Sequence, residues 1–351
     1  MVHPIPSNGT LGELLWQASR READHRRRAL ERAARAARLW AEEAADLVAA
    51  GRSLTELPSV GPWIAGRLQE WLDDPPPPRE PEPTRRGFLT WADVRRALDA
   101  DVEWEARPHG DLQVHSTDSD GALPLADIAE AAEALGRTFI ASTDHSKSLR
   151  IAHGMDEAML ERHNREVDRL NAGFVDRGSA FTILRSIEMD VLEDGSGDMD
   201  PAALASLDLV LGAFHTKLRV TDDATDRYLA ALRNPTVHVL AHPVARMYGR
   251  RVGLTADWPH VFEEAARLGK AVEIDATPAR QDLNVELARI AVASGVRWFS
   301  IGSDAHVAAE LKFLPFGLAI ATLAGVPRER ILNYRSADDV RAWARTVGDH
   351  G

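Results

Sequence analysis

Seven short, mostly apolar runs recur between residues 111 and 302, and segments with a helical pattern separate most of them. The runs lie at residues 111–115, 138–143, 182–188, 208–214, 236–241, 271–275 and 297–302, and clear helical patterns lie at 126–134, 156–171 and 261–268. Nearly continuous apolar strands suit a parallel sheet that is covered on both faces. Seven strand–helix units in about 240 residues predict an α/β fold, a seven-stranded (β/α)7 barrel.

The first 74 residues have a different pattern, which predicts helices only. Residues 10–48 are rich in Ala, Leu, Arg and Glu, with no Pro and no Gly after Gly12. The run Leu57-Pro58-Ser59-Val60-Gly61-Pro62 then interrupts the helical pattern, and a fresh apolar run follows it. This arrangement predicts two short helices joined by a tight hairpin.

Residues 73–83 are the sharpest break in composition, because six of them are proline. Proline fixes its own backbone and restricts the preceding residue, so we expect an extended, semi-rigid spacer here. The chain is therefore predicted to have three parts: a helical domain at 1–74, a linker with a connecting helix at 75–106, and a barrel at 107–351.

Composition narrows the classes of function. The 351 residues carry 42 Lys and Arg against 54 Asp and Glu, a formal net charge of −12, which argues against a general nucleic-acid coat but allows a local basic surface. The absence of Cys excludes disulfides, thiolate zinc sites and cysteine nucleophiles. The sequence shows no secretory leader and no apolar run of roughly 20 residues, so we expect a cytoplasmic protein without a membrane partner.

Histidines and carboxylates gather at the ends of the predicted strands. His115, His145, His215 and His242 each close or follow a strand, and the seventh strand leads into Ser303-Asp304-Ala305-His306. Side chains at the carboxyl ends of parallel barrel strands converge on one mouth, so these groups are expected to meet. Imidazoles and carboxylates without thiols are typical ligands of Zn²⁺, Mn²⁺ or Fe²⁺.

A single histidine at a strand end is more often a hydrogen-bonded core residue than a ligand, and a carboxylate there is usually a helix cap. Five of the 13 histidines occupy such positions, however, and this favours a metal centre. The third strand adds Glu188, and the sixth adds Glu273 and Asp275, which could also serve only to orient their neighbours. The other histidines, among them His163, are expected at the surface.

These segments resemble the polymerase and histidinol phosphatase (PHP) family. The motifs that carry the resemblance are Gly110-Asp111-Leu112-Gln113-Val114-His115-Ser116, Ser119-Asp120-Gly121, Thr143-Asp144-His145-Ser146, Ile187-Glu188-Met189-Asp190, His215, Leu240-Ala241-His242-Pro243 and Gly302-Ser303-Asp304-Ala305-His306. The similarity is greatest to the PHP domain that follows bacterial family X DNA polymerases. It implies a distorted seven-stranded barrel that holds two or three divalent metal ions, Zn²⁺, Mn²⁺ or Fe²⁺.

The resemblance also implies ligand roles. One ion would be surrounded by Gln113, His115, Glu188 and Asp304. Glu188 would bridge to a second ion, which His215 also binds. The third ion would be held by Asp120, His145, His242 and His306, although the distribution of the later histidines among the ions is left open.

Position 113 departs from the family pattern, because it is His there and Gln here. An amide oxygen is a weaker ligand for zinc than an imidazole, but the i, i+2 spacing along a strand still points Gln113 to the same face as His115. We therefore expect a weakened ion site and an active enzyme. Glu188, Asp304 and Arg246 are expected to take part in catalysis. A phosphate would be gripped by Arg246, Arg250 or Lys217, unless these are surface charges.

The N-terminal segment resembles the small helical domain that begins family X polymerases and ends in a helix-hairpin-helix. In such a hairpin, backbone N–H groups at the start of the second helix and a small glycine let a DNA phosphate approach closely. The matching residues are Val60, Gly61, Trp63, Ala65 and Gly66. Residues 20–38 carry eight Arg against three acidic residues, which fits either a phosphate-facing surface or an ordinary solvated helix. The stretch between Leu72 and Arg107 is too short for a polymerase palm.

Clustered divalent ions bind phosphate oxygens, generate a hydroxide from a bound water and stabilise the leaving oxygen, so phosphoester hydrolysis is the expected reaction. A DNA-binding appendage points to DNA 3′ ends as substrate, for a 3′–5′ exonuclease or a 3′-phosphatase of DNA repair. Two alternatives stay open. One is a phosphatase for phosphorylated small molecules, of histidinol-phosphatase type; the other is a degenerate module that binds DNA or a partner without catalysis.

Overall fold

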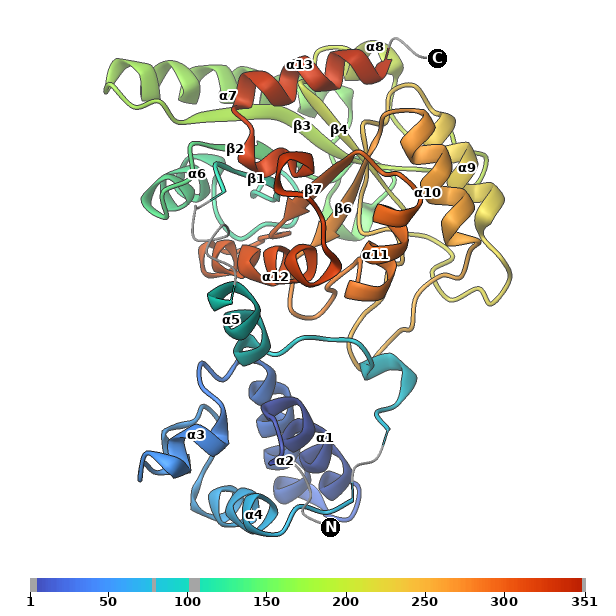
Figure 1. Ribbon diagram of the computed structural model, residues 1–351. Helices are drawn as coiled ribbons and strands as arrows, with labels where there is room; N and C mark the ends of the chain where they lie inside the picture. Colours follow the sequence, from blue (N-terminus) through green and yellow to red (C-terminus); the bar gives the residue numbers. More distant parts are fainter. Residues whose placement is uncertain (1–4, 78–79, 101–107, 349–351) are drawn as a thin grey trace. The chain divides into compact units, whose positions relative to one another are not determined.

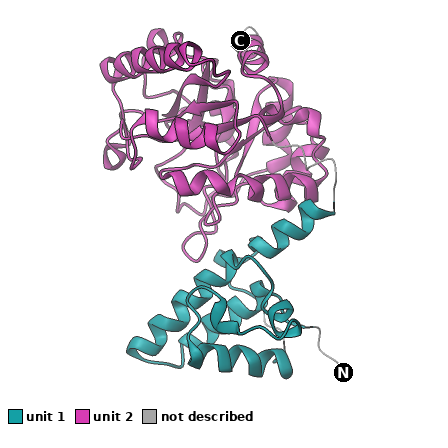
Figure 2. Cartoon of the chain, turned by 90° about the vertical axis from the view of Figure 1, so that its left-hand side faces the viewer, with its two compact units in different colours: residues 1–100 teal, residues 101–351 magenta. Residues whose placement is uncertain are grey.

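The computed structural model describes residues 5–77, 80–100 and 108–348, and the chain divides into two compact units, residues 1–100 and 101–351 (Figure 2). The predicted boundary after residue 74 falls inside the first unit, and the predicted boundary between 106 and 107 lies outside the described residues. The first unit thus includes the described part of the proline-rich segment and the helix that follows it, and the three-part division stays a prediction.

The described part of the first unit is helical and has its own core. Its helices are α1 (Asn8–Ser19), α2 (Asp24–Ala36), α3 (Ala44–Ala49), α4 (Pro62–Asp73) and α5 (Trp91–Asp99), with the single 3₁₀ turns η1 (Ala37–Leu39), η2 (Leu54–Glu56) and η3 (Pro83–Arg85). Apolar side chains from successive helices meet in the interior, where Leu11, Leu15, Leu30, Trp40 and Leu68 are completely buried. The prediction of an all-helical N-terminal region is confirmed.

The predicted hairpin lies between η2 and α4. Its first helix is reduced to one 3₁₀ turn, whereas the second begins with Gly61 as N-cap and Pro62 at the first helical position. The Trp40 indole Nε1 donates a hydrogen bond to the carbonyl oxygen of Pro58, at 3.0 Å, and so ties the turn to the core. The turn is therefore fixed from inside, and its Gly61 end faces solvent.

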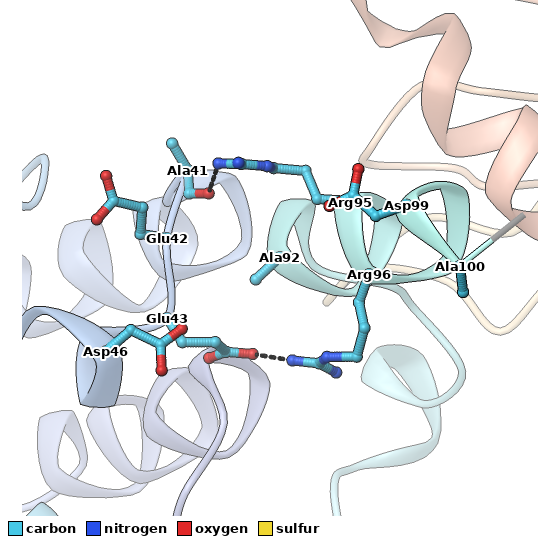
Figure 3. A pocket seen from close by; sticks show the side chains of 9 residues that line it. All are labelled: Ala41, Glu42, Glu43, Asp46, Ala92, Arg95, Arg96, Asp99 and Ala100. Atoms are coloured by element: carbon cyan, nitrogen blue, oxygen red, sulfur yellow. Dashed lines mark hydrogen bonds and ion pairs between the residues drawn. The ribbon is translucent and has the colours of Figure 1, made fainter. Parts of the chain in front are cut away.

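Helix α5 is anchored to the first unit by two arginines (Figure 3). Arg96 Nη2 lies 2.8 Å from Glu43 Oε1, and Arg95 Nη1 donates to the carbonyl oxygen of Ala41 at 2.9 Å. A cavity of about 450 Å³ lies between this helix and the segment that leads into α3. Because both arginines are engaged by these partners, α5 extends the helical unit.

The second unit is a barrel of seven parallel strands that follow one another in sequence order (Figure 1). The strands are β1 (Gly110–Val114), β2 (Phe139–Ser142), β3 (Thr182–Asp190), β4 (Leu209–Ala213), β5 (Val239–Leu240), β6 (Ala271–Asp275) and β7 (Trp298–Gly302). The barrel is nearly closed, because the segment after β7 returns to β1: Asp304 N donates to Gln113 O at 3.0 Å, and His115 N donates to Ala305 O at 2.9 Å. The predicted α/β barrel is confirmed.

Every predicted strand overlaps an observed one, but β5 is shorter than predicted. Residue 236 belongs to a turn instead, because its backbone N–H and its hydroxyl both donate to the Asn234 side chain. The pairing of β5 with β4 and β6 is correspondingly brief and involves Val239 and Leu240.

Helices surround the barrel. They are α6 (Leu125–Ala134), α7 (Glu157–Asp176), α8 (Pro201–Leu204), α9 (Thr225–Arg233), α10 (Trp258–Arg267), α11 (Val285–Ala293), α12 (Leu314–Ala324) and α13 (Ala337–Gly348), with 3₁₀ turns at Arg150–Ala152, Ala308–Phe313, Arg328–Arg330 and Leu332–Tyr334. Helix α13 packs its Val340 and Trp343 against the barrel core, and the Trp343 indole donates to Gly269 O just before β6. The start of the strands is thereby covered and their carboxyl ends are left for chemistry. Among the described helices, none is long and apolar enough to cross a membrane.

The buried Lys270 at the start of β6 predicts a pH-dependent stability. It is 2% exposed and burial lowers its pKa to about 7, whereas an unfolded chain keeps it near the ordinary value. The unfolded state then binds more protons between pH 7 and 10, so the free energy of unfolding should rise with pH in this window, by on the order of 2 kcal/mol from pH 7 to 9. Urea denaturation of wild type and Lys270→Met at both pH values checks this. An equal change in the free energy of unfolding between pH 7 and 9 in the two proteins would contradict it.

Candidate metal centre

The predicted ligands come together at the carboxyl ends of the strands. Gln113 lies in β1 and Glu188 in β3, while His215, His242 and Asp304 each follow the last residue of β4, β5 or β7 by two positions. Gln113, His115 and Glu188 are completely buried, and His145, His242 and Asp304 are nearly so. The convergence follows from the parallel order of the strands, which places all of these ends at one mouth.

Glu188 lies at the middle of the cluster, between four imidazoles. Its Oε1 is 2.6 Å from His242 Nε2 and 3.1 Å from His215 Nε2. Its Oε2 is 3.2 Å from His145 Nδ1 and 3.4 Å from His115 Nε2. One carboxylate on β3 thus contacts imidazoles from the ends of four other strands, and this is the geometry that a bridging ligand needs.

Three overlapping groups of ligand atoms surround this carboxylate, the atoms of each group lying within 4.8 Å of one another. They are His115, Asp120, His145 and His306; His145, Glu188 and His215; and His115, Glu188 and Asp304. Within them, His306 Nε2 is 3.2 Å from Asp120 Oδ1, and His115 Nε2 is 3.0 Å from Asp304 Oδ1. All three groups consist of imidazoles and carboxylates, which suit Zn²⁺, Mn²⁺ or Fe²⁺.

The expected set leaves open which ion His242 would serve. His242 lies beside His215 and Glu188, with 5.6 Å between the two imidazole centroids, and it belongs to none of the groups that contain Asp120. His145 is instead common to two groups. The assignment of ligands to individual ions stays a prediction.

Gln113 has the place of a ligand but no hydrogen-bond partner. Within the described part of the chain, neither its Oε1 nor its Nε2 is hydrogen-bonded, although both atoms are buried. Glu188 Oε2 and Glu273 Oε1 are likewise buried without a hydrogen bond among the described residues. Buried polar atoms are normally satisfied, so these orphaned oxygens fit a centre that holds cations.

Gly302 allows Gln113 and Glu273 to approach each other. A Cβ added to Gly302 would lie 2.5 Å from the Cβ of Gln113 and 2.6 Å from Glu273 Oε1. Real Cβ atoms do not approach other atoms so closely, so this position accepts only glycine while the two side chains stay in place.

The backbone at two ligands is held in the left-handed region. Asp304 has φ 52° and His242 has φ 25°, which is costly for residues other than glycine. Hydrogen bonds hold both: Asp304 N donates to Gln113 O at 3.0 Å, and His242 N donates to Glu273 Oε2 at 2.7 Å. The barrel framework therefore aims these side chains before any ion binds.

The buried carboxylates of the centre repel one another. Burial raises the pKa of Glu273 and that of Asp275 well above the usual range, and neighbouring carboxylates add to the effect. Burial also acts on Glu188, but His145, His242 and His215 outweigh it and hold its pKa well below the ordinary value. A site of this composition favours multivalent cations.

The imidazoles differ in basicity. Burial lowers the pKa of His145 to about 4, so its ring is a neutral ligand at pH 7. Burial also acts on His215, but Glu188 and Asp190 outweigh it and raise the pKa of His215 to about 9. For His306, burial is likewise outweighed, by Asp120 and Asp304, and its pKa is about 9. These two histidines would release their protons on binding a metal ion.

Arg280 is a neighbour of the centre whose role sequence reasoning missed. Its Nε lies 3.4 Å from Asp304 Oδ2 and 3.7 Å from Asp275 Oδ2. Arg246 is buried, at 5% exposure, and burial lowers its pKa to about 10, so it is not a surface charge. Lys217 is exposed and pairs with Glu193. Only the nearness of Arg280 to the Glu273–Asp275 segment could have indicated its place, because 24 residues separate it from Asp304.

The hairpin residues lie in the first unit and are described by themselves. Val60 is buried at 6% exposure, whereas Gly61 and Gly66 are exposed and Trp63 is 39% exposed. The guanidinium carbons of Arg26 and Arg67 lie 5.4 and 5.5 Å from the Trp63 ring centroid. Of the eight arginines in residues 20–38, all but Arg38 are exposed. This arrangement leaves a basic surface with one accessible indole.

Known proteins are similar to about two thirds of the chain. No protein-family model matches the chain. The DNA polymerase/3′-5′ exonuclease PolX of Bacillus subtilis is 37% identical over 237 residues, which are 67% of this chain and 41% of that protein. A probable phosphatase of Tolumonas auensis is 28% identical over 233 residues, 64% of this chain and 88% of that protein. The chain belongs to the PHP family.

Among solved structures, a histidinol phosphate phosphatase from Lactococcus lactis covers 59% of the chain at 16% identity and a TM-score of 0.42. The chain spans less than half the length of PolX, so what PolX does as a whole is not carried over from the similarity alone. Membership of the PHP family confirms the resemblance seen in the sequence.

Position 113 offers a test of the PHP centre. Replacing Gln113 by His should raise the affinity for Zn²⁺, by about tenfold or more, because imidazole is a better zinc ligand than an amide oxygen. Competition with a chelator of known affinity measures the change, and Gln113→Leu, which offers no ligand atom, should shift the affinity in the opposite direction. Equal zinc affinities in all three proteins would remove Gln113 from the centre.

Proposed function

We propose that the chain hydrolyses phosphoester bonds at DNA 3′ ends, as a 3′–5′ exonuclease or a 3′-phosphatase acting in DNA repair. The observation that carries the proposal is the position of the Glu188 carboxylate between four imidazoles, with Asp120 and Asp304 at the flanks. Three overlapping ligand groups around one carboxylate are the arrangement of a multinuclear hydrolytic centre.

Two or three divalent ions would be held by the nine predicted ligands, and when bound they would supply Lewis acidity and a nucleophile at neutral pH. The uncharged oxygen of Gln113 favours Mn²⁺ or Fe²⁺ over Zn²⁺ at the ion that Glu188 and Asp304 share. The side chains that would hold the ions are the amide of Gln113 and the imidazoles and carboxylates of His115, Asp120, His145, Glu188, His215, His242, Asp304 and His306.

The chain's own residues would orient the substrate. Glu188 bridges the ligand groups and so fixes their spacing. Arg280 holds Asp304 in place through its Nε contact at 3.4 Å. Arg246, buried beside the β5 end, would grip a phosphate oxygen of the substrate, since an arginine fork suits phosphate geometry.

DNA as the substrate is supported by the first unit. A hairpin with an exposed glycine at the N-terminus of α4 can accept a backbone phosphate, and the exposed arginines of residues 20–38 would add sequence-independent attraction. The similarity to a protein named as a polymerase and 3′-5′ exonuclease agrees with this choice. A cytoplasmic location is part of the same proposal.

A second candidate is hydrolysis of a phosphorylated small molecule. It is favoured by the similarity to the probable phosphatase, of which the chain spans 88%. A catalytically silent module that binds DNA or a partner would share the fold but show no turnover of either substrate.

The nuclease proposal predicts shortening of a 5′-labelled single-stranded oligonucleotide from its 3′ end in the presence of Mn²⁺. Asp304→Ala and His215→Ala should each lower the rate by at least 100-fold, because each removes a ligand group while the barrel core stays intact. Denaturing gel electrophoresis measures the products. Turnover of only a phosphomonoester such as p-nitrophenyl phosphate would support the second candidate, and activity that survives both substitutions would overturn the assignment of the site.

The DNA-binding role of the hairpin predicts that Trp63→Ala weakens binding of a short oligonucleotide by about 1–3 kcal/mol, the value of one stacked base. Fluorescence anisotropy at two salt concentrations measures the affinity and its salt dependence. Val175→Ala, at an exposed position of α7 in the second unit, is the control and should bind DNA as wild type does. Unchanged affinity in Trp63→Ala would remove this residue from the interface.

A further inference from the structure

His163 was expected at the surface, and the structure shows the opposite. Its side chain has no exposed area, because it lies on the barrel-facing side of α7 next to Leu160 and Val167. Its Nδ1 is 2.7 Å from Asp118 Oδ2. A completely buried imidazole thus meets the tip of the loop of residues 116–121, which connects two predicted ligands, His115 and Asp120.

The base of this loop is fixed from the inside. Gly121 N donates to Ser116 O at 2.8 Å, which closes the loop into a tight turn. The buried Asp144 accepts three further hydrogen bonds: from Ser116 N at 2.8 Å, Ser116 Oγ at 2.7 Å and Ser119 Oγ at 2.6 Å. Both oxygens of Asp144 are used in this way, so this residue holds the loop and does not reach the centre.

The tip of the loop is fixed from the outside by His163. Asp118 is half-exposed, and a cavity of about 240 Å³ that Met159, Arg162 and Glu166 also line lies beside it. The cavity leaves room for Asp118 to swing away if the imidazole does not hold it. Asp120 follows two residues later and contacts His306 at 3.2 Å, so a displaced tip would displace this ligand as well.

We infer that His163 is a positioning residue of the metal centre, which holds Asp120 toward His145 and His306 by fixing Asp118. The inference rests on the proposed function, since it requires that Asp120, His145 and His306 hold an ion. Helix α7 contributes no ligand. By this inference it nevertheless affects the affinity for the ion near Asp120, and it leaves the affinity for the ions near Glu188 unchanged.

The experiment measures metal ions, not turnover. Wild type, His163→Leu and Asp118→Ala are loaded with Mn²⁺, and the number of bound ions and their affinities are measured against a competing chelator. Both variants should bind one ion about 10–100-fold more weakly and keep the others, as expected when a partner of a ligand is lost. If His163→Leu does not fold, Asp118→Ala alone tests the inference. The Asp118 side chain is half-exposed, so its removal creates no buried cavity.

Two controls separate positioning from general damage. His163→Asn should bind this ion more tightly than His163→Leu and about as tightly as wild type, because its amide N–H can donate to Asp118 from nearly the position of Nδ1. If His163 only filled space, the Asn and Leu variants would bind the ion equally. Glu161→Ala, at an exposed position of the same helix that pairs with Arg165, should bind all ions as wild type does. Far-UV circular dichroism should be unchanged in every variant.

Several results would overturn the inference. They are equal ion affinities in wild type and both variants, equal weakening of all ions, failure of His163→Asn to restore binding, or anomalous scattering that locates an ion between Asp118 and His163. Wild type that binds no ion would instead overturn the proposed function itself, so the two failures are distinguishable.

Discussion

The burial of the Glu188 carboxylate sets the requirements that the rest of the barrel meets. A charged group without contact to water costs several kcal/mol unless opposite charge and hydrogen-bond donors surround it. Four imidazoles lie within 3.4 Å of its two oxygens, each from a different strand end, and His242 Nε2 is hydrogen-bonded to Oε1. The position of one carboxylate thus fixes the positions of four strand ends and of the loops that follow them.

The order of the strands explains how residues so distant in sequence reach this point. Each strand lies beside its predecessor, and each crossover returns the chain to the same starting edge, so the carboxyl ends accumulate at one mouth. The last step joins Asp304 and Ala305 to Gln113 and His115 by backbone hydrogen bonds. Closure therefore places the two ends of the ligand series, β1 and the segment after β7, next to each other.

Much of this arrangement could be predicted from the sequence, because strand periodicity and the position of a residue at a strand end need no knowledge of side-chain packing. The convergence of His115, Glu188 and Asp304 follows from topology alone. The place of His242 beside His215 follows from the neighbouring strands β4 and β5, but the ion that His242 would serve could not be predicted, since this depends on side-chain geometry at the mouth. His163 and Arg280 were missed for a related reason: their partners lie 45 and 24 residues away, and only the folded loops bring them together.

The seam, which is the set of backbone hydrogen bonds between β1 and the segment after β7, links the stability of the barrel to the binding of ions. Three of the four residues whose backbones close the barrel also have side chains at the centre, so an ion that draws Gln113, His115 and Asp304 together would also tighten the closure. By linkage, binding free energy at the mouth is then folding free energy for the whole second unit. Removal of the ions by a chelator would therefore lower the free energy of unfolding of the second unit. A substitution that loosens the seam, however far from any substrate, would in turn weaken ion binding.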